Sequence, residues 1–173
     1  LDIIPSNSKL AGAEIELVSM FTRETILKQI IQNIMGKYKY IIIDCPPSLG
    51  LLTINALTAS NSIIIPIQCE YYALDGLSQL LNTIRLVQKN LNSHLEIEGI
   101  LITMFDSRLN LSQQVLKEVQ DYFGDKVYKT LINRNVKLGE APSHGKPIIL
   151  YDASSTGSQN YMNLVSEILH NND

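Results

Sequence analysis

Apolar residues along this chain fall into short continuous runs that alternate with longer segments in which they recur every three or four positions. A short apolar run bounded by turn residues predicts a strand buried on both faces of a parallel sheet, and the longer spacing predicts an amphipathic helix. The expected strands are residues 1–4, 40–43, 62–67, 97–104 and 126–132. The expected helices are residues 10–18, 22–36, 50–60, 74–91, 111–123 and 158–170. This alternation predicts an α/β fold with a three-layer, doubly wound, mostly parallel sheet.

Two local features refine this prediction. Thr22 is a suitable N-cap and Gly36 a suitable C-cap glycine for the second helix. Residues 133–146 are polar and are expected to form a long loop. No internal repeat, linker or low-complexity segment interrupts the chain, so we expect a single domain over residues 1–173.

Composition and charge narrow the function classes. With 173 residues, 45% of them hydrophobic, the chain is long and apolar enough for one folded core. A net charge of −3 excludes a globally basic nucleic-acid binder, but it is compatible with a local basic patch. Cys45 and Cys69 give no CxxC pair and no disulfide framework, which fits a reducing cytosol. No apolar run approaches the roughly 18 residues that suggest a membrane span.

The apolar run 40–43 leads directly into Asp44, which Cys45, Pro46, Pro47 and Ser48 follow. Ligands of open α/β sheets bind at the carboxyl ends of the strands, and an ionised carboxylate there requires a partner. We therefore expect Asp44 to face a hydrated Mg²⁺ beside phosphates, as the Walker B carboxylate of phosphate-binding ATPases does. The alternative is that Asp44 only caps the helix that follows.

Basic residues gather in the second half of the chain. Four of them and no acidic residue lie between Lys126 and Gly139, namely Lys126, Lys129, Arg134 and Lys137. Such a bias in an acidic chain predicts a surface that faces phosphates, with an ordinary solvated loop as the alternative. No segment resembles a helix-turn-helix, so any DNA binding should be independent of sequence.

Five stretches together resemble one family. They are residues 10–17, 44–50, 66–76, 103–108 and 134–147. In this order they resemble the ParA/Soj chromosome- and plasmid-partitioning ATPases, which belong with MinD to the deviant Walker A group of P-loop NTPases. The resemblance implies a P-loop NTPase-like fold, ATP and Mg²⁺ as cofactors, and an ATP-dependent homodimer that binds non-specific DNA. It also implies a ParB-type centromere-binding partner, a cytoplasmic, nucleoid-associated location and no membrane contact.

The resemblance also assigns roles to individual residues. Asp44 would be catalytic and would hold Mg²⁺ through a water molecule. Residues that would contact the nucleotide are Pro46, Pro47, Glu70, Met104, Phe105, Asp106 and Pro142. Residues that would contact DNA are Arg108, Arg134 and Lys137. The alternatives are a plain turn for the two prolines, core packing for Met104 and Phe105, and a solvated loop carboxylate or a dimer contact for Glu70.

The sequence departs from the family in one respect. The family's P-loop has the form KGGVGKT, and the 173 residues contain no Gly-Lys-Thr or Gly-Lys-Ser. We therefore expect an N-terminally incomplete piece, about the C-terminal two thirds of a ParA-type ATPase domain. We also expect these 173 residues alone neither to bind ATP with micromolar affinity nor to hydrolyse it, which calorimetry with ATP and Mg²⁺ would test.

Three other functions are compatible with parts of this pattern. A MinD-like ATPase that positions the division site would end in a basic amphipathic helix, whereas residues 165–173 lack Lys and Arg. An iron–sulfur reductase would need Cys45 and Cys69 as cluster ligands, but neither has Gly-rich surroundings. A non-catalytic DNA-binding or scaffolding fragment is the third alternative.

Overall fold

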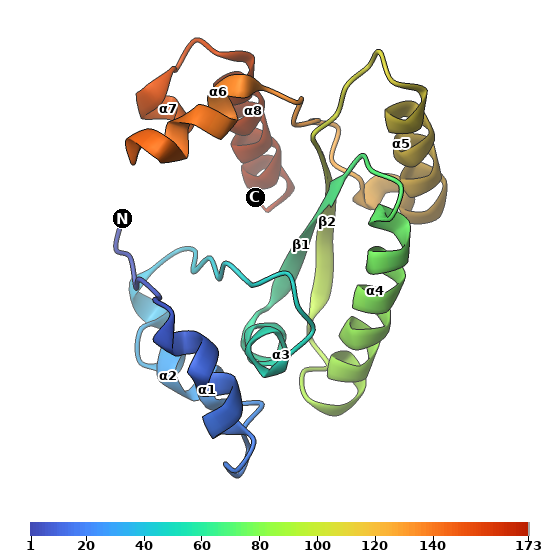
Figure 1. Cartoon of the computed structure of the whole chain (residues 1–173). Coiled ribbons are helices and arrows are strands. Elements are labelled where there is room, and N and C mark those ends of the chain that lie inside the picture. The colour runs from blue at the N-terminus through green and yellow to red at the C-terminus, as the bar shows by residue number, and fades with distance from the viewer. Residues whose placement is uncertain (173) are drawn as a thin grey trace. The chain divides into compact units, whose positions relative to one another are not determined.

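The computed structural model, drawn as a ribbon in Figure 1, describes residues 1–172. Their contacts divide them into two compact units. The first unit comprises Leu1–Ile63 and Gln79–Glu96, and the second comprises Ile64–Ser78 and the residues from Ile97 onward. The elements are, in chain order, α1 Lys9–Leu17, α2 Ile26–Gln32, α3 Leu51–Ala59, β1 Ser62–Gln68, α4 Ala73–Asn90, β2 Glu96–Thr103, α5 Asn110–Phe123, α6 Val136–Glu140, α7 Ile148–Tyr151 and α8 Thr156–Asn171. Short 3-10 helices cover Met35–Lys37, Gly124–Lys126 and Ala141–His144.

In the first unit, the buried side chain of Asn55 joins α3 to the segment around α2. Its amide nitrogen donates to the carbonyl oxygens of Arg23 at 2.8 Å and Leu51 at 2.9 Å. Its amide oxygen accepts from the backbone N–H of Leu27 at 3.1 Å. Both polar atoms of this buried amide therefore have hydrogen-bond partners. A buried amide that is paired in this way carries no large energetic cost.

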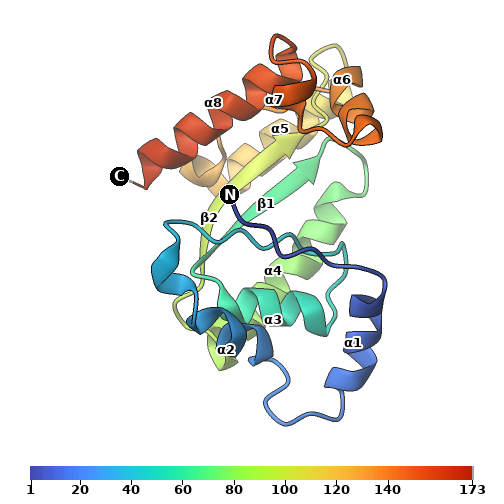
Figure 2. The same cartoon turned by 90° about the vertical axis from the view of Figure 1, so that its left-hand side faces the viewer.

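The second unit contains a parallel sheet. Strands β1 and β2 are neighbours, and their arrows point the same way in Figure 1 and in Figure 2. The chain after α5 returns beside β2, where Ile100 pairs with Val127 and Phe105 with Asn133 in isolated parallel bridges. The expected parallel α/β class is therefore confirmed.

A small apolar core supports the sheet of the second unit. Its buried members are Leu101, Tyr128, Ile132 and Leu164, and Ile64, Leu138 and Ile168 pack against them. Gly99 lies under the ring of Tyr128, because a Cβ atom built on Gly99 would lie 2.6 Å from the ring carbon Cζ. A glycine at this position of β2 is what lets the aromatic ring approach the strand.

Seven of the expected elements are confirmed. The expected helices 10–18, 50–60, 74–91, 111–123 and 158–170 correspond to α1, α3, α4, α5 and α8, and the expected strands 62–67 and 97–104 correspond to β1 and β2. Helix α8 begins after Ser155, whose side-chain oxygen accepts from the backbone N–H of Ser158 at 3.2 Å. The small helix α7 is an element that the sequence pattern did not predict.

The strands expected at residues 1–4 and 40–43 are wrong, because both segments are irregular. Ile42 is 92% exposed, and Ile3 and Ile4 are exposed as well. A strand exists only through hydrogen bonds to a neighbouring strand, and among residues 1–172 no backbone hydrogen bond connects 40–43 to one. An apolar run therefore identifies a segment suited to a sheet, but the partner strand decides whether it becomes one.

The strand expected at residues 126–132 is also wrong, although this segment runs beside β2. Tyr128 and Ile132 donate their backbone N–H groups to the carbonyl oxygens of Ile100 and Ile102. Between them, the N–H groups of Lys129 and Thr130 donate to the carboxylate of Glu167 on α8, at 2.7 and 2.9 Å. The carboxylate of α8 thus occupies the N–H group of Thr130, which a regular ladder with β2 would use between those of Tyr128 and Ile132.

Three expectations about helix ends and loops are wrong as well. Thr22 is not an N-cap, because its φ is +54° and α2 begins only after Thr25. Gly36 is not the C-cap of that helix, because α2 ends at Gln32 and Gly36 lies in the following 3-10 helix. The expected polar loop 133–146 contains α6 and a 3-10 helix instead.

No helix within residues 1–172 has the length and apolar character needed to cross a membrane.

Candidate functional site

The residues that the sequence analysis singled out lie in both units, and each unit is described separately. In the first unit, Asp44, Pro46 and Pro47 are exposed members of the irregular segment before α3. The N-cap of α3 is Gly50 and no side chain caps it, so Asp44 does not cap this helix. The capping alternative is therefore wrong, and the structure gives Asp44 no structural role as a cap.

The surroundings of Asp44 indicate which kind of metal site this residue could belong to. Within residues 1–172, no three His, Cys, Asp or Glu side chains are grouped so that they could hold a metal ion alone. Mg²⁺ in nucleotide sites is typically held by one or two carboxylates, several waters and the phosphates of the substrate. A single exposed carboxylate after an apolar run fits that arrangement, whereas it would not fit an all-protein metal cage.

In the second unit, the nucleotide candidates follow the carboxyl ends of the two strands. Glu70 comes two residues after β1, and Met104, Phe105 and Asp106 come directly after β2. Phe105 is buried, donates its backbone N–H to Ile132 and accepts at its carbonyl oxygen from Arg134. This environment agrees with the core-packing alternative for Phe105.

Met104 has an unusual backbone, because its φ is +53°. Non-glycine residues in this left-handed region carry strain, and such residues are concentrated at functional sites. The turn at Met104 redirects the chain from β2 into the segment that holds Asp106 and Arg108. Its conformation is therefore part of what positions these two charged residues.

Asp106 and Arg108 form a close ion pair. Arg108 donates from Nε to Oδ1 at 2.9 Å, from Nη2 to Oδ2 at 2.7 Å, and from its backbone N–H to Oδ1 at 3.0 Å. These hydrogen bonds from Arg108 lower the pKa of Asp106 to about 2, with a smaller contribution from the charge of Arg134. The Asp106 side chain is only 13% exposed while that of Arg108 is 85% exposed, so the guanidinium covers the carboxylate and faces outward.

Arg134 and Glu70 form a looser pair. Nη2 of Arg134 lies 3.8 Å from Oε1 of Glu70, and both side chains are exposed. The backbone N–H of Arg134 donates to Phe105, which ties the arginine to the segment after β2. A residue expected to contact nucleotide, Glu70, thus pairs with a residue expected to contact DNA.

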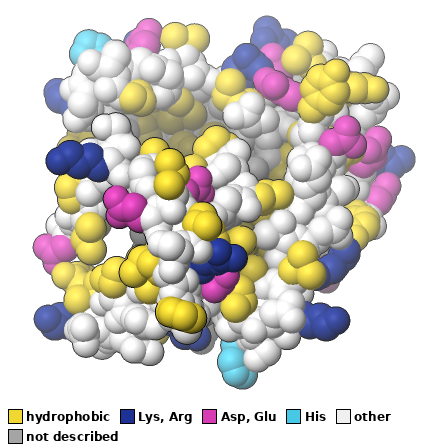
Figure 3. All heavy atoms as spheres, turned by 60° about the horizontal axis from the view of Figure 1, so that its bottom comes forward, with side chains coloured by type: hydrophobic (Ala, Val, Ile, Leu, Met, Phe, Trp, Pro, Cys, Tyr) yellow, Lys and Arg dark blue, Asp and Glu magenta, His cyan; other side chains and the backbone are white. Residues whose placement is uncertain are grey.

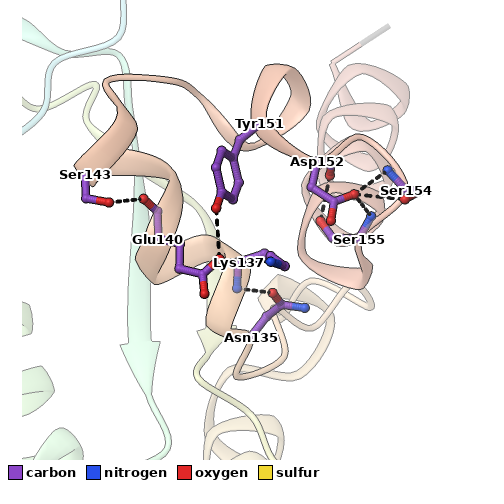
Figure 4. Close-up of polar contacts among 8 residues, drawn as sticks. All are labelled: Asn135, Lys137, Glu140, Ser143, Tyr151, Asp152, Ser154 and Ser155. Carbon is purple, nitrogen blue, oxygen red and sulfur yellow. Dashed lines mark hydrogen bonds and ion pairs between the residues drawn. The ribbon is translucent and has the colours of Figure 1, made fainter.

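Lys137 lies on α6, in a cluster of polar side chains (Figure 4). The side chain of Asn135 caps α6 by accepting from the backbone N–H of Lys137 at 2.8 Å. Nζ of Lys137 donates to Oε2 of Glu140 at 3.0 Å, and the hydroxyl of Tyr151 donates to the same oxygen at 2.9 Å. The ring of Tyr151 stacks on that of His144, with their centroids 5.0 Å apart. Pro142 is exposed and lies in the 3-10 helix Ala141–His144, which comes between α6 and α7 in sequence.

Each of the three cations expected to contact DNA therefore has a carboxylate beside it. Residues 126–139 contain no acidic side chain, but the fold supplies Asp106, Glu70 and Glu140 from outside that stretch. On the face drawn in Figure 3, basic and acidic side chains are likewise interspersed. Neither Glu140 nor Tyr151 was singled out by the sequence pattern. The spacing of Lys137 and Glu140 on a helix is a signal that indicates their pair, whereas nothing in the sequence indicates Tyr151.

Comparisons with known proteins place this chain among proteins of one family. A protein-family profile described as an AAA domain matches residues 1–97. The chain is 65% identical over 171 residues to the sporulation initiation inhibitor protein Soj of Bacillus subtilis (strain 168), covering 99% of this chain and 68% of Soj. It is 54% identical over 169 residues to the chromosome partitioning protein ParA of Myxococcus xanthus, covering 98% of this chain and 60% of that protein.

A solved structure gives the same fold. The cobyrinic acid a,c-diamide synthase of Mycobacterium smegmatis, crystallised with an ATP analogue and magnesium, is 37% identical with a TM-score of 0.79. The match covers 96% of this chain and 61% of that protein. Across these three proteins, this chain spans between 60% and 68% of the relative's length.

Proposed function

Because the chain belongs to the Soj/ParA family of partitioning ATPases, we propose that its full-length protein moves chromosome or plasmid origins by ATP-dependent dimerisation and non-specific DNA binding. The observation that carries this proposal is the 65% identity to Soj over 171 residues. A ParB-type centromere-binding protein would stimulate hydrolysis and release the dimer from the nucleoid, which would place the protein in the cytoplasm.

The nucleotide part of the proposal rests on the ends of the apolar segments. Asp44 would hold Mg²⁺ through a water molecule, and Pro46 and Pro47 would begin the segment that responds to the γ-phosphate. Glu70, Met104, Asp106 and Pro142 would lie around the nucleotide, and Phe105, the fifth residue that the resemblance assigns there, is buried as its core-packing alternative requires. The exposure of Asp44 and the strained backbone of Met104 support these assignments. Arg108 donates hydrogen bonds to both carboxylate oxygens of Asp106. Asp106 would therefore contact the nucleotide through its own backbone rather than through its carboxylate.

The DNA part of the proposal rests on Arg108, Arg134 and Lys137. All three are exposed, and each is anchored near its backbone by a hydrogen bond of its own N–H group, to Asp106, Phe105 and Asn135 respectively. A fixed backbone with an exposed cationic end is suited to phosphate contacts, which position a protein on DNA without reading its sequence.

The test uses the full-length protein and two duplexes of unrelated sequence. With ATP and Mg²⁺ we expect a dimer by sedimentation and equal affinity for both duplexes, with ADP giving a monomer and weak binding. Addition of a ParB-type protein should accelerate hydrolysis. A protein that binds DNA equally well without ATP, or that prefers one duplex strongly, would contradict the proposal.

The name of the mycobacterial structure suggests a different activity, the amidation of a corrin precursor. That protein is 37% identical to this chain, against 65% for Soj, so partitioning is the better supported function. Release of phosphate from ATP that depends on DNA and a ParB-type protein would distinguish it from release that depends on a corrin acid and an ammonia donor.

A further inference from the structure

The carboxylate of Glu140 has two donors on one oxygen atom. Nζ of Lys137 lies 3.0 Å from Oε2, and the hydroxyl of Tyr151 lies 2.9 Å from the same atom (Figure 4). The lysine comes from the same helix, α6, whereas the tyrosine comes from α7. Glu140 therefore retains a hydrogen bond if either donor leaves.

The two donors differ in how freely they can move. Lys137 is exposed and its flexible chain joins Glu140 through a single hydrogen bond. Tyr151 is half-buried, and its ring stacks on His144 at 5.0 Å, which restricts the position of its hydroxyl. Of the two donors, the lysine is therefore the one that turns more freely towards a ligand in solution.

A DNA phosphate that binds Lys137 must compete with Glu140 for the same ammonium group. An exposed ion pair of this kind is weak, typically 0.2–1 kcal/mol, so a phosphate can displace it. The carboxylate left behind would be costly to leave without a donor, but the Tyr151 hydroxyl remains in place.

We propose that Glu140 is a positioning residue that competes with DNA phosphate for Lys137, and that Tyr151 stabilises Glu140 when Lys137 moves to the phosphate. This inference rests on the proposed role of Lys137 in DNA binding. Glu140 would then act as an internal competitor that keeps the affinity for DNA lower than Lys137 alone would make it. A lower affinity suits a protein that must leave DNA again.

The charges support the competition. The hydrogen bond from Lys137, and next that from Tyr151, lower the pKa of Glu140, while the hydrogen bond to Glu140 raises the pKa of Lys137. Both groups therefore stay charged at neutral pH. The other titratable groups around Glu140 are His144, which adds a small favourable charge, and Asp152, which lies near Lys137.

The experiment measures binding of the full-length, ATP-bound protein to duplex DNA as a function of salt. Glu140→Gln should bind about two- to fivefold more tightly, the range of an exposed ion pair. The salt slope should stay unchanged, because no phosphate contact is added. Tyr151→Phe should bind more weakly than the parent, because Glu140 then depends on Lys137 alone. The hydroxyl of Ser143 donates to the backbone carbonyl oxygen of Glu140, and this hydrogen bond does not involve the side chains changed in the two variants.

The same two changes in a Lys137→Ala background separate the inference from a general charge effect. Both should lose their influence there, and Glu118→Gln, an exposed carboxylate on α5, should have none in either background. If Glu140→Gln tightens binding equally without Lys137, or if Tyr151→Phe tightens it, the competition is wrong. If Lys137→Ala itself changes neither affinity nor slope, then the proposed DNA role of Lys137 fails first.

Discussion

At the scale of single residues, Tyr128 has a buried hydroxyl with no hydrogen-bond partner among the described residues. Its side chain is 4% exposed, and burial, with smaller contributions from the charges of Glu98 and Glu167, raises its pKa to about 12. A buried hydroxyl without a partner costs about 1–3 kcal/mol. Tyr128 therefore contributes to the core through its ring, and its hydroxyl opposes folding.

We predict that Tyr128→Phe raises the free energy of unfolding by about 1 kcal/mol, because it removes only the unpaired hydroxyl. Urea unfolding of the parent and the variant measures the difference. Tyr161→Phe on α8 is the matched control and should change little, because that residue is exposed. A variant destabilised by a similar amount would mean that the hydroxyl has a partner, such as an ordered water.

Asp44 is the residue on which the proposed nucleotide chemistry depends most. In the full-length protein, Asp44→Ala should reduce ATP hydrolysis by about tenfold or more and abolish ATP-dependent dimerisation, because the Mg²⁺ site loses its carboxylate. Phosphate release and sedimentation with ATP measure the two effects. The control is Asp121→Ala, which removes an exposed carboxylate from α5. Hydrolysis at the parental rate would remove Asp44 from the proposed site.

At the scale of elements, Glu167 shows how one side chain on α8 shapes a neighbouring segment. Its carboxylate accepts the backbone N–H groups of Lys129 and Thr130. Burial alone would raise the pKa of Glu167, but the hydrogen bonds from Thr130 and Lys129 outweigh burial, so the pKa is lowered. The ionised carboxylate therefore stabilises the folded state.

We predict that Glu167→Gln lowers the free energy of unfolding at pH 7 by about 1 kcal/mol, because a hydrogen bond to a neutral amide is weaker than one to a carboxylate. The pKa in the folded state lies below the ordinary 4.5, so this stabilisation is present above pH 4.5 and is lost as the pH falls through the folded-state pKa. Urea unfolding at pH 7 and well below pH 4.5 should show the difference only at the higher pH. A difference that persists in acid, or that Glu118→Gln reproduces, would contradict this role.

Elements also show where prediction from sequence succeeded and where it failed. Residues 62–67 and 40–43 each contain three consecutive isoleucines, yet only the first segment became a strand, because only it has β2 as a neighbour. Segment 126–132 lost its ladder to a carboxylate that lies about 40 positions further along the chain. Helices such as α4 and α5 were predicted correctly, because their apolar spacing is a local property that requires no distant partner.

The candidate site also combines features that local sequence indicates with features that depend on distant residues. The positions of Asp106, Arg108 and Lys137 after β2 and on the late loop were indicated by local sequence, and the structure places all three in the second unit. The pairing of Arg134 with Glu70 and the hydrogen bond from Tyr151 to Glu140 were not indicated, because Glu70 and Tyr151 come from other elements. The sequence therefore did not reveal which carboxylate lies beside which cationic side chain.

At the scale of the whole molecule, the two contact units raise the question of cooperativity. We propose that residues 1–173 form one folding domain, because α4 contributes residues to both units along one continuous helix. The prediction is a single unfolding transition in urea, with circular dichroism and tyrosine fluorescence giving the same midpoint. Two transitions with separate midpoints would show that the units unfold independently.

The last prediction concerns the response of DNA binding to salt in the full-length, ATP-bound protein. Each phosphate contact releases condensed counterions and contributes about −0.9 to the log–log slope of affinity against salt on duplex DNA. Arg108→Ala/Lys137→Ala should therefore flatten the slope, and it should weaken binding to unrelated duplexes alike, because phosphate contacts carry no sequence information. Hydrolysis of ATP in the absence of DNA and partner should change little, because these side chains are assigned to DNA.

A salt titration of the parent and of this double variant decides the matter. Lys117→Ala on α5 is the matched control, since it removes an exposed positive charge that no proposed contact uses. It should leave the slope unchanged, which separates specific phosphate contacts from the loss of net charge. An unchanged slope and affinity in Arg108→Ala/Lys137→Ala would instead assign both cations, with their carboxylates Asp106 and Glu140, to an ordinary solvated surface.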